Sequence, residues 1–170
     1  MILDKIGFGG GCHWCTEAVF QALKGVEKVE QGYIASTGEN SNLSEAVIVH
    51  FNRKCINLIT LIEIHLLTHN STSNHSMRKK YRSAVYTFNE EQHHVVAAML
   101  QDFQYQFNNQ VITQTLPFHD FEPSREEITN YYIKNPEAPF CETYINPKLK
   151  LLLQQFSGFV DPHKMVHLKA

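Results

Sequence analysis

One short segment near the N-terminus restricts the fold and the chemistry more than any other part of the chain. Apolar residues including Ile6 and Phe8 lead into three glycines, and Cys-His-Trp-Cys follows at positions 12–15. A helical apolar pattern begins directly afterwards, at Ala18. This order places Cys12 at or beside a helix N-terminus, where free N–H groups and the positive end of the helix dipole favour a thiolate. Because the thiolate is the nucleophilic form of cysteine, the segment predicts a reactive thiol at Cys12.

Size and charge narrow the class of protein. The 170 residues are 43% hydrophobic and 19% charged, with a net charge of −2 at pH 7, which favours one globular domain over residues 1–170. We expect its core at about 3–157 and an irregular tail at 158–170. No basic stripe predicts nucleic-acid binding, and the longest apolar run, residues 56–67, is too short and polar to span a membrane. Four cysteines without an export signal indicate a reducing compartment, so we expect a cytoplasmic protein.

Strand and helix patterns alternate along the chain. Candidate helix caps stand at Asn57, Asn89 and Ser124. Because the second and third strands can pair through the loop at 36–42, we expect an α+β two-layer sandwich with a mixed sheet, a ferredoxin-like core and a helical C-terminal tail. The predicted strands cover residues 3–9, 26–36, 45–51, 83–88 and 111–117, and the predicted helices cover residues 12–24, 58–67, 89–107, 124–135 and 148–156.

Several short motifs together resemble one known family, peptide methionine sulfoxide reductase of the A type. The segment from Gly11 to Glu17 is similar to the family's glycine-rich signature, and Gly32-Tyr33, the strand at 45–49 and Tyr81-Arg82-Ser83 match later motifs in the right order. The resemblance covers roughly residues 3–157. It implies a repair enzyme that reduces the S epimer of methionine sulfoxide, free or in proteins, with thioredoxin or another dithiol as reductant and with no metal or other cofactor.

The resemblance also implies a role for each matching residue. Cys12 would attack the sulfoxide sulfur, while Glu45, in an apolar pocket, would protonate the departing oxygen. Tyr33 and Tyr81 match two family tyrosines whose O–H groups would hydrogen-bond that oxygen. Trp14 would form one wall of the pocket for the substrate methyl group. The sulfenic acid left on the nucleophile would condense with a second thiol into a disulfide, which thioredoxin would reduce.

The second thiol stays open between two cysteines at this point. Cys15 lies one helical turn from Cys12, whereas Cys141 would have to be brought in by the C-terminal region, so we place Cys15 first. Cys55 stands between a strand and an apolar helix, and we expect it to be a buried hydrophobic residue. Glu17 is assigned a structural role.

Three departures from the family affect the expected site. His13 stands where the family usually has Phe: it either belongs to the substrate-binding site, where an imidazole could lower the pKa of Cys12 or hydrogen-bond the sulfoxide, or points away at the surface. The loop before Tyr81 lacks the family's Asp, and His75 or Ser76 are its candidate substitutes. The family's His-Gln pair and the cysteine tail of some members are also missing.

Other classes of function fit parts of the sequence. Cys12-x-x-Cys15 beside a β-α-β pattern is also typical of a thiol–disulfide oxidoreductase. A metal-binding module could use Cys12, His13 and Cys15 with a distant His or Cys141, although structural zinc sites usually have two cysteine pairs. A non-catalytic relative of the fold is a third possibility. The segment Tyr81-Arg82-Ser83 and the order of elements favour the reductase.

Overall fold

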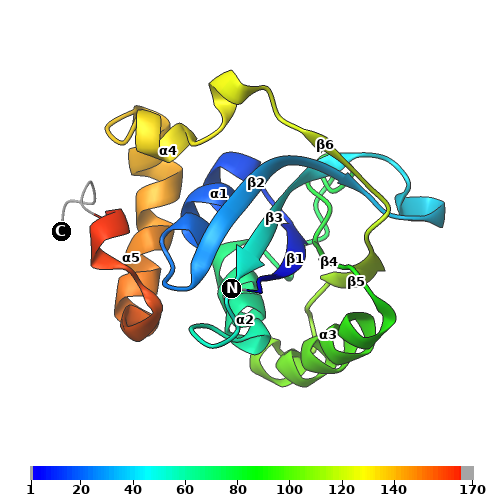
Figure 1. The fold of residues 1–170 in the computed structure, drawn as a ribbon. Helices are drawn as coiled ribbons and strands as arrows, with labels where there is room; N and C mark the ends of the chain where they lie inside the picture. Colours follow the sequence, from blue (N-terminus) through cyan, green and yellow to red (C-terminus); the bar gives the residue numbers. More distant parts are fainter. Residues whose placement is uncertain (1, 166–170) are drawn as a thin grey trace.

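A six-stranded mixed sheet forms the centre of the computed structural model, which describes residues 2–165 (Figure 1). Its spatial order is β5-β4-β1-β3-β2-β6, with β4 and β5 parallel and the other neighbours antiparallel. The inner order β4-β1-β3-β2 is the predicted ferredoxin-like core. The strands are β1 (Asp4–Gly9), β2 (Val26–Ala35), β3 (Ser44–Phe51), β4 (Ala84–Thr87), β5 (Gln114–Pro117) and β6 (Asp120–Pro123).

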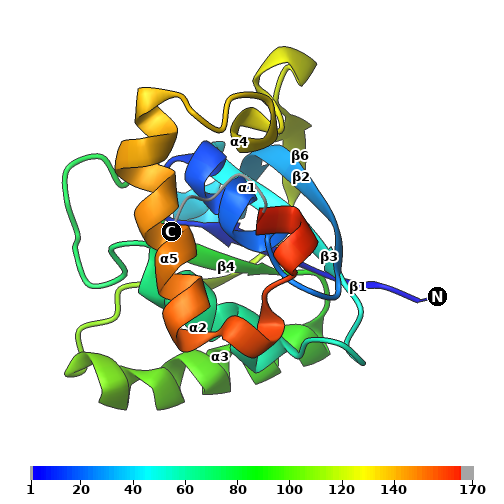
Figure 2. The same cartoon turned by 90° about the vertical axis from the view of Figure 1, so that its left-hand side faces the viewer.

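Helices cover the sheet and complete the chain. They are α1 (His13–Gln21), α2 (Leu58–Thr68), α3 (Glu90–Phe103), α4 (Tyr131–Lys134) and α5 (Asn146–Gln155). A π-helical turn, Cys141–Ile145, leads into α5 and packs against α1, while α5 itself packs against α2 (Figure 2). The expected tail forms short 3₁₀ turns at Ser157–Phe159 and Pro162–Met165, and its remainder, residues 166–170, lies outside the described residues. Within residues 2–165, no helix is long and apolar enough to cross a membrane.

Two of the three predicted caps are confirmed. The side chain of Asn57 accepts the N–H of Thr60 at 3.0 Å, and that of Asn89 accepts the N–H of Gln92 at 2.8 Å. Each bond satisfies one N–H group that the first helical turn leaves free. The local sequence was therefore sufficient to place the starts of α2 and α3.

The predicted helix over 124–135 is wrong. The N–H of Ser124 donates to the carbonyl of Gln31 at 3.0 Å, so Ser124 continues the pairing of β6 with β2 instead of capping a helix. A 3₁₀ turn at Glu126–Ile128 and the four-residue α4 follow. The sequence pattern did not predict strand β6. It forms here in place of a helix because its backbone hydrogen bonds complete the edge of the sheet.

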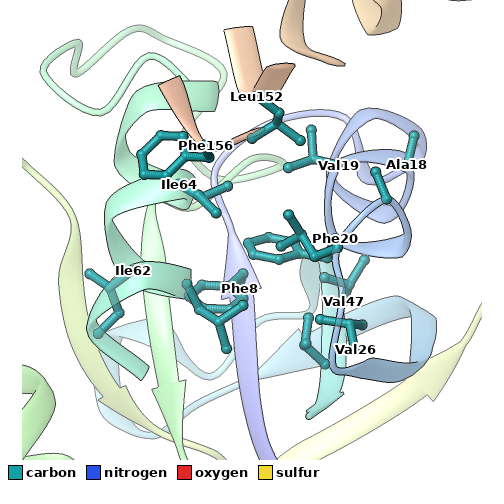
Figure 3. Close-up of a cluster of buried hydrophobic side chains, with 14 of the residues drawn as sticks. Phe8, Ala18, Val19, Phe20, Val26, Val47, Ile62, Ile64, Leu152 and Phe156 are labelled. Carbon is teal, nitrogen blue, oxygen red and sulfur yellow. The ribbon is translucent and has the colours of Figure 1, made fainter. Parts of the chain in front are cut away.

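The main core lies between the sheet and the helices. Figure 3 shows Phe8 of β1 facing Phe20 of α1, whose rings stack with centroids 4.6 Å apart, and Ile64 of α2 and Leu152 of α5 close over them. A smaller cluster, which includes Ile48 and Tyr86, covers the other face of the sheet. Since side chains alternate along a strand, Glu45 shares the α1-covered face with its neighbours Val47 and Val49.

Candidate active site

Cys12 lies at the predicted helix N-terminus. It is the N-cap of α1, and its carbonyl accepts the N–H groups of Cys15 and Thr16 at 3.1 and 3.2 Å. The glycine turn before it is needed for space, because a Cβ on Gly10 would overlap the imidazole of His69. Arg78 donates to the carbonyls of Gly10 and Tyr81 at 2.9 Å each, which ties this turn to the loop across the site.

The two cysteines of this turn have opposite proton affinities. The Cys15 thiol donates a hydrogen bond to the Cys12 sulfur, and this bond, with the N–H groups of Trp14 and Cys15, lowers the pKa of Cys12 to about 7. The same bond, together with burial, raises the pKa of Cys15 well above its ordinary value. Near neutral pH, Cys12 is therefore partly a thiolate, and Cys15 keeps its proton.

Glu45 lies inside the protein, next to the first turn of α1 that follows Cys12. The residue is 7% exposed, and its Oε1 accepts the peptide N–H of His13 at 3.2 Å. Tyr33 is its direct partner across β2 and β3. Lys80 Nζ lies 3.6 Å from Oε2, and His13 Nε2 lies 3.4 Å from Oε1. The expectation of an apolar pocket was wrong, because α1 brings His13 and the loop before β4 brings Lys80 to this carboxyl group.

His13 adopts the inward orientation of the two that the sequence left open. The residue is 4% exposed, and its Nδ1 lies 3.0 Å from the carbonyl oxygen of Gly32. Its ring meets that of Tyr33 edge-on, with centroids 5.2 Å apart. The imidazole thus lies between the first turn of α1 and the strands that carry Tyr33 and Glu45.

An open cavity of about 430 Å³ gives access to the Cys12 thiol. Tyr81 lines it, as do His75 and Ser76 from the loop that lacks the family's Asp. The Nδ1 of His75 accepts the N–H of Met77 at 3.2 Å, so it is used within its own loop. The cavity is lined by Gly11, Cys12, Cys15, His75, Ser76, Met77, Tyr81, Phe140, Tyr144 and Lys148.

Trp14 is not among the residues that line this cavity, contrary to the expectation that it forms one of its walls, and it contacts the cavity lining through a neighbouring ring. It stacks on Tyr131 with centroids 3.9 Å apart and meets Phe140 edge-on at 5.3 Å. Phe140, together with Tyr144, lines the cavity near Cys12. Sequence reasoning missed both of these aromatic residues, although their position next to Cys141 was an available signal.

Lys148 is a second site residue that the sequence did not reveal. Its Nζ donates to the carbonyl of Thr68, and burial lowers its pKa, while the charges of Cys15 and Cys12 oppose that shift. In return, its ammonium group lowers the pKa of Cys15 against the larger opposing effects. No local motif distinguishes it from other lysines, because only the docking of α5 turns it toward the thiols.

The remaining cysteines and Glu17 occupy contrasting places. Cys55 is exposed, so its prediction as a buried residue was wrong: it lies in the turn between β3 and α2, outside the core. Cys141 is fully buried, its Sγ donates to the carbonyl of Asn135 at 3.1 Å, and burial raises its pKa. Glu17 has the expected structural role, since its buried carboxylate accepts bonds from Gln31 and from the N–H of Tyr131.

Residues 2–165 contain no group of three or more His, Cys, Asp or Glu side chains that could hold a metal ion. A metal-binding module therefore finds no ligand set in this part of the chain. What the site does hold is a nucleophilic thiol, a second thiol bonded to it and a buried carboxyl group beside it.

Comparison with known proteins decides between a sulfoxide reductase and a thiol–disulfide oxidoreductase. Residues 4–158 match the family described as peptide methionine sulfoxide reductase. The chain belongs to this family. A peptide methionine sulfoxide reductase MsrA of Pasteurella multocida (strain Pm70) is 34% identical over 155 residues, which cover 83% of this chain and 89% of that protein. The MsrA of Trichodesmium erythraeum (strain IMS101) is 32% identical over 176 residues, covering 94% and 99%.

Solved structures agree on the fold of this peptide methionine sulfoxide reductase. Mxr1 from Saccharomyces cerevisiae in its reduced form superposes with a TM-score of 0.74 at 21% identity, covering 84% of this chain and 91% of that chain. Mxr1 in complex with Trx2 gives a TM-score of 0.60 at 22% identity, covering 74% and 83%. The predicted fold class and the predicted family are both confirmed.

Proposed function

We propose that this peptide methionine sulfoxide reductase acts on the S epimer of methionine sulfoxide, with Cys12 as nucleophile and Glu45 as acid. One observation carries the proposal: the buried carboxyl group of Glu45 accepts the peptide N–H of the residue directly after Cys12. This hydrogen bond holds the acid beside the nucleophile. The reaction requires such an arrangement, because attack on sulfur and protonation of the oxygen are coupled.

The reaction balances with one proton. The Cys12 thiolate attacks the sulfoxide sulfur while the oxygen takes a proton from Glu45. The S–O bond then breaks as the oxygen passes to the cysteine sulfur, leaving a thioether and a sulfenic acid on Cys12. The hydroxyl groups of Tyr33, which faces Glu45 across the strands, and of Tyr81, which lines the cavity, hydrogen-bond the oxygen as charge develops on it.

The sulfenic acid is resolved by Cys15. Its thiol already bonds to the Cys12 sulfur, and condensation of the two releases water and forms a disulfide. Thioredoxin reduces that disulfide, which is consistent with the complex of the structural relative Mxr1 with Trx2. The enzyme needs no metal or other cofactor for these steps.

The catalytic unit is a single domain of residues 1–170, with its core in about 3–157. A reducing compartment such as the cytoplasm suits a chain whose four cysteines, all within the described residues, are free. Trp14 and His13 belong to the substrate-binding part of the site. Trp14 contacts Phe140, which lines the cavity, and His13 contacts the proposed acid Glu45.

The test is dithiothreitol-driven reduction of the separate S and R epimers of a blocked methionine sulfoxide. We expect turnover of the S epimer alone and no turnover by Cys12→Ser. The matched control is Cys55→Ser, an exposed cysteine outside the site, which should keep the full rate. Failure of the wild type on both epimers, or activity in Cys12→Ser, would contradict the proposal.

A further inference from the structure

We propose that His13 is a positioning residue for the acid step. It shares one proton with Glu45 and thereby keeps that carboxyl group able to donate a proton to the sulfoxide oxygen. The inference rests on the proposed function, since it concerns the acid of that reaction. It assigns to His13 a task in proton supply, in place of the direct substrate contact that the sequence suggested.

Both ring nitrogens of His13 face oxygen atoms. Nδ1 lies 3.0 Å from the carbonyl oxygen of Gly32, and Nε2 lies 3.4 Å from Oε1 of Glu45. The two side chains are almost fully buried, with 5% and 9% of their surfaces exposed. In such a place water cannot readily stand in for a missing hydrogen-bond partner, so the number of protons at this contact matters.

The carbonyl of Gly32 determines the tautomer of the imidazole. A carbonyl oxygen only accepts, so Nδ1 must carry a hydrogen. In a neutral imidazole Nε2 is then unprotonated. An unprotonated nitrogen that faces a carboxylate oxygen brings two lone pairs together, and they repel each other. The contact with Glu45 is favourable only when one proton lies in it, as imidazolium with carboxylate or as imidazole with carboxylic acid.

Three other groups lie close to this pair, and one more titratable group lies on the adjacent strand β6. Lys80 lies 3.6 Å from Oε2 of Glu45 and favours loss of the proton, whereas the Cys12 thiolate, whose own pKa the Glu45 charge raises, favours its retention. The ring of Tyr33 packs edge-on against the imidazole, and the exposed Glu122 of β6 lies opposite Tyr33. Lys80 is itself largely exposed, so solvent screens its charge.

Because the proton is shared, the pair of His13 and Glu45 can still supply it at a pH at which Cys12 is a thiolate. An isolated glutamic acid has lost its proton well below neutral pH, whereas an isolated imidazolium loses it near neutrality. The pair delivers its proton from Oε1 of Glu45 to the sulfoxide oxygen as the Cys12–sulfur bond forms. The proton released when Cys12 ionises again after disulfide reduction balances the one consumed, so the cycle needs no further acid.

The first test compares the pH profile of His13→Gln with that of the wild type. Glutamine keeps a polar side chain but cannot hold the extra proton. We expect kcat to fall with little change in KM, and we expect the loss at pH 7.5 to exceed the loss at pH 5 by about ten-fold or more, because acid loads Glu45 alone. The rate of Cys12 alkylation, measured in parallel, corrects for thiolate content. His94→Gln, an exposed helical histidine, is the matched control.

A loss that is constant with pH would overturn the proposal and leave His13 a purely structural role. A rise in KM with kcat retained would overturn it in favour of direct substrate binding.

The second test requires no activity, so it separates this proposal from the proposed function. Nitrogen-15 NMR of the imidazoles, with His13 assigned by its absence in His13→Gln, should show Nδ1 protonated throughout and Nε2 gaining a proton as pH falls. In Glu45→Gln this gain should move to lower pH, because the carboxylate that holds the proton is gone. A neutral His13 protonated at Nε2, or a titration unchanged in Glu45→Gln, would refute the shared proton.

Discussion

The Cys12 thiol stands between two regions that are built in different ways. On one side, which we call the strand side, Glu45 and Tyr33 come from β3 and β2, with His13 against them. On the other, the helix side, Cys15 belongs to α1 and Lys148 comes from α5. In the proposed function, the strand side supplies the proton and the helix side supplies the second thiol. Under that proposal, one nucleophile depends on two independent kinds of structural support.

The two regions are held by different interactions. On the strand side, the backbone ladder of β2 and β3 places Tyr33 opposite Glu45, and a one-residue slip would turn Glu45 to the other face of the sheet. On the helix side, α5 is positioned by buried side chains such as Leu149 and Leu152. A ladder sets position through every backbone bond, whereas a docked helix depends on the shape of a few side chains.

We expect the largest effect from a substitution on the helix side. Cys15→Ser should form one methionine per enzyme and then stop in the thioredoxin-coupled assay, because the sulfenic acid on Cys12 has no thiol to condense with. Quantifying methionine after a single turnover, alongside NADPH use with thioredoxin and its reductase, measures both steps. Cys141→Ser is the matched control and should recycle normally. Retained recycling in Cys15→Ser, with loss in Cys141→Ser, would transfer the resolving role to Cys141.

We expect the next largest effect from a substitution on the strand side. Glu45→Gln should lower the dithiothreitol-driven kcat/KM by about 10²–10⁴-fold, the usual contribution of a positioned acid. Alkylation of Cys12 should persist and should become faster at pH 6, because removal of the Glu45 charge, which raises the pKa of Cys12, lets that pKa fall further below about 7. Glu39→Gln, in an exposed 3₁₀ turn, serves as control. Near-normal turnover in Glu45→Gln would remove the acid from this side.

A smaller effect sharpens the comparison by testing two hydroxyl donors, one on the strand side and one on the loop before β4. Tyr33→Phe and Tyr81→Phe should each lower kcat by about ten-fold, the cost of one hydrogen bond to a developing charge. If both hydroxyl groups bind the same oxygen, the double variant should lose less than the product of the single losses. Steady-state kinetics on the S epimer measures this. Unchanged kcat in either single variant would exclude that tyrosine from the oxygen site.

The smallest effect concerns the cation of the helix side. Lys148→Met should slow disulfide formation about three-fold, because loss of the ammonium group raises the pKa of Cys15 further and leaves less of its reactive form. Stopped-flow fluorescence of Trp14, the one tryptophan of the chain, can follow this step. Lys150→Met, on the exposed face of the same helix, is the control. Equal rates in the two variants would show that Lys148 does not act on Cys15.

Much of the fold was predictable because its signals are local. Cys12 at the start of α1 follows from a strand, a glycine turn and a helical pattern in sequence, and the caps Asn57 and Asn89 bond to residues three positions away. Ser124 had the same local pattern and failed. Its N–H found a distant strand partner, Gln31, and a ladder bond displaced the cap.

By itself, the sequence determined the place of Cys12 at a helix N-terminus, the order of the core strands and the family. Only the tertiary structure decided that His13 turns inward to Glu45, that Lys148 faces the thiols and that Cys55 lies outside the core. The physical reason is the range of the interactions. A cap or a glycine turn is satisfied within a few residues, whereas the contact of His13 with Glu45 joins residues 32 positions apart and exists only once register and helix docking are complete.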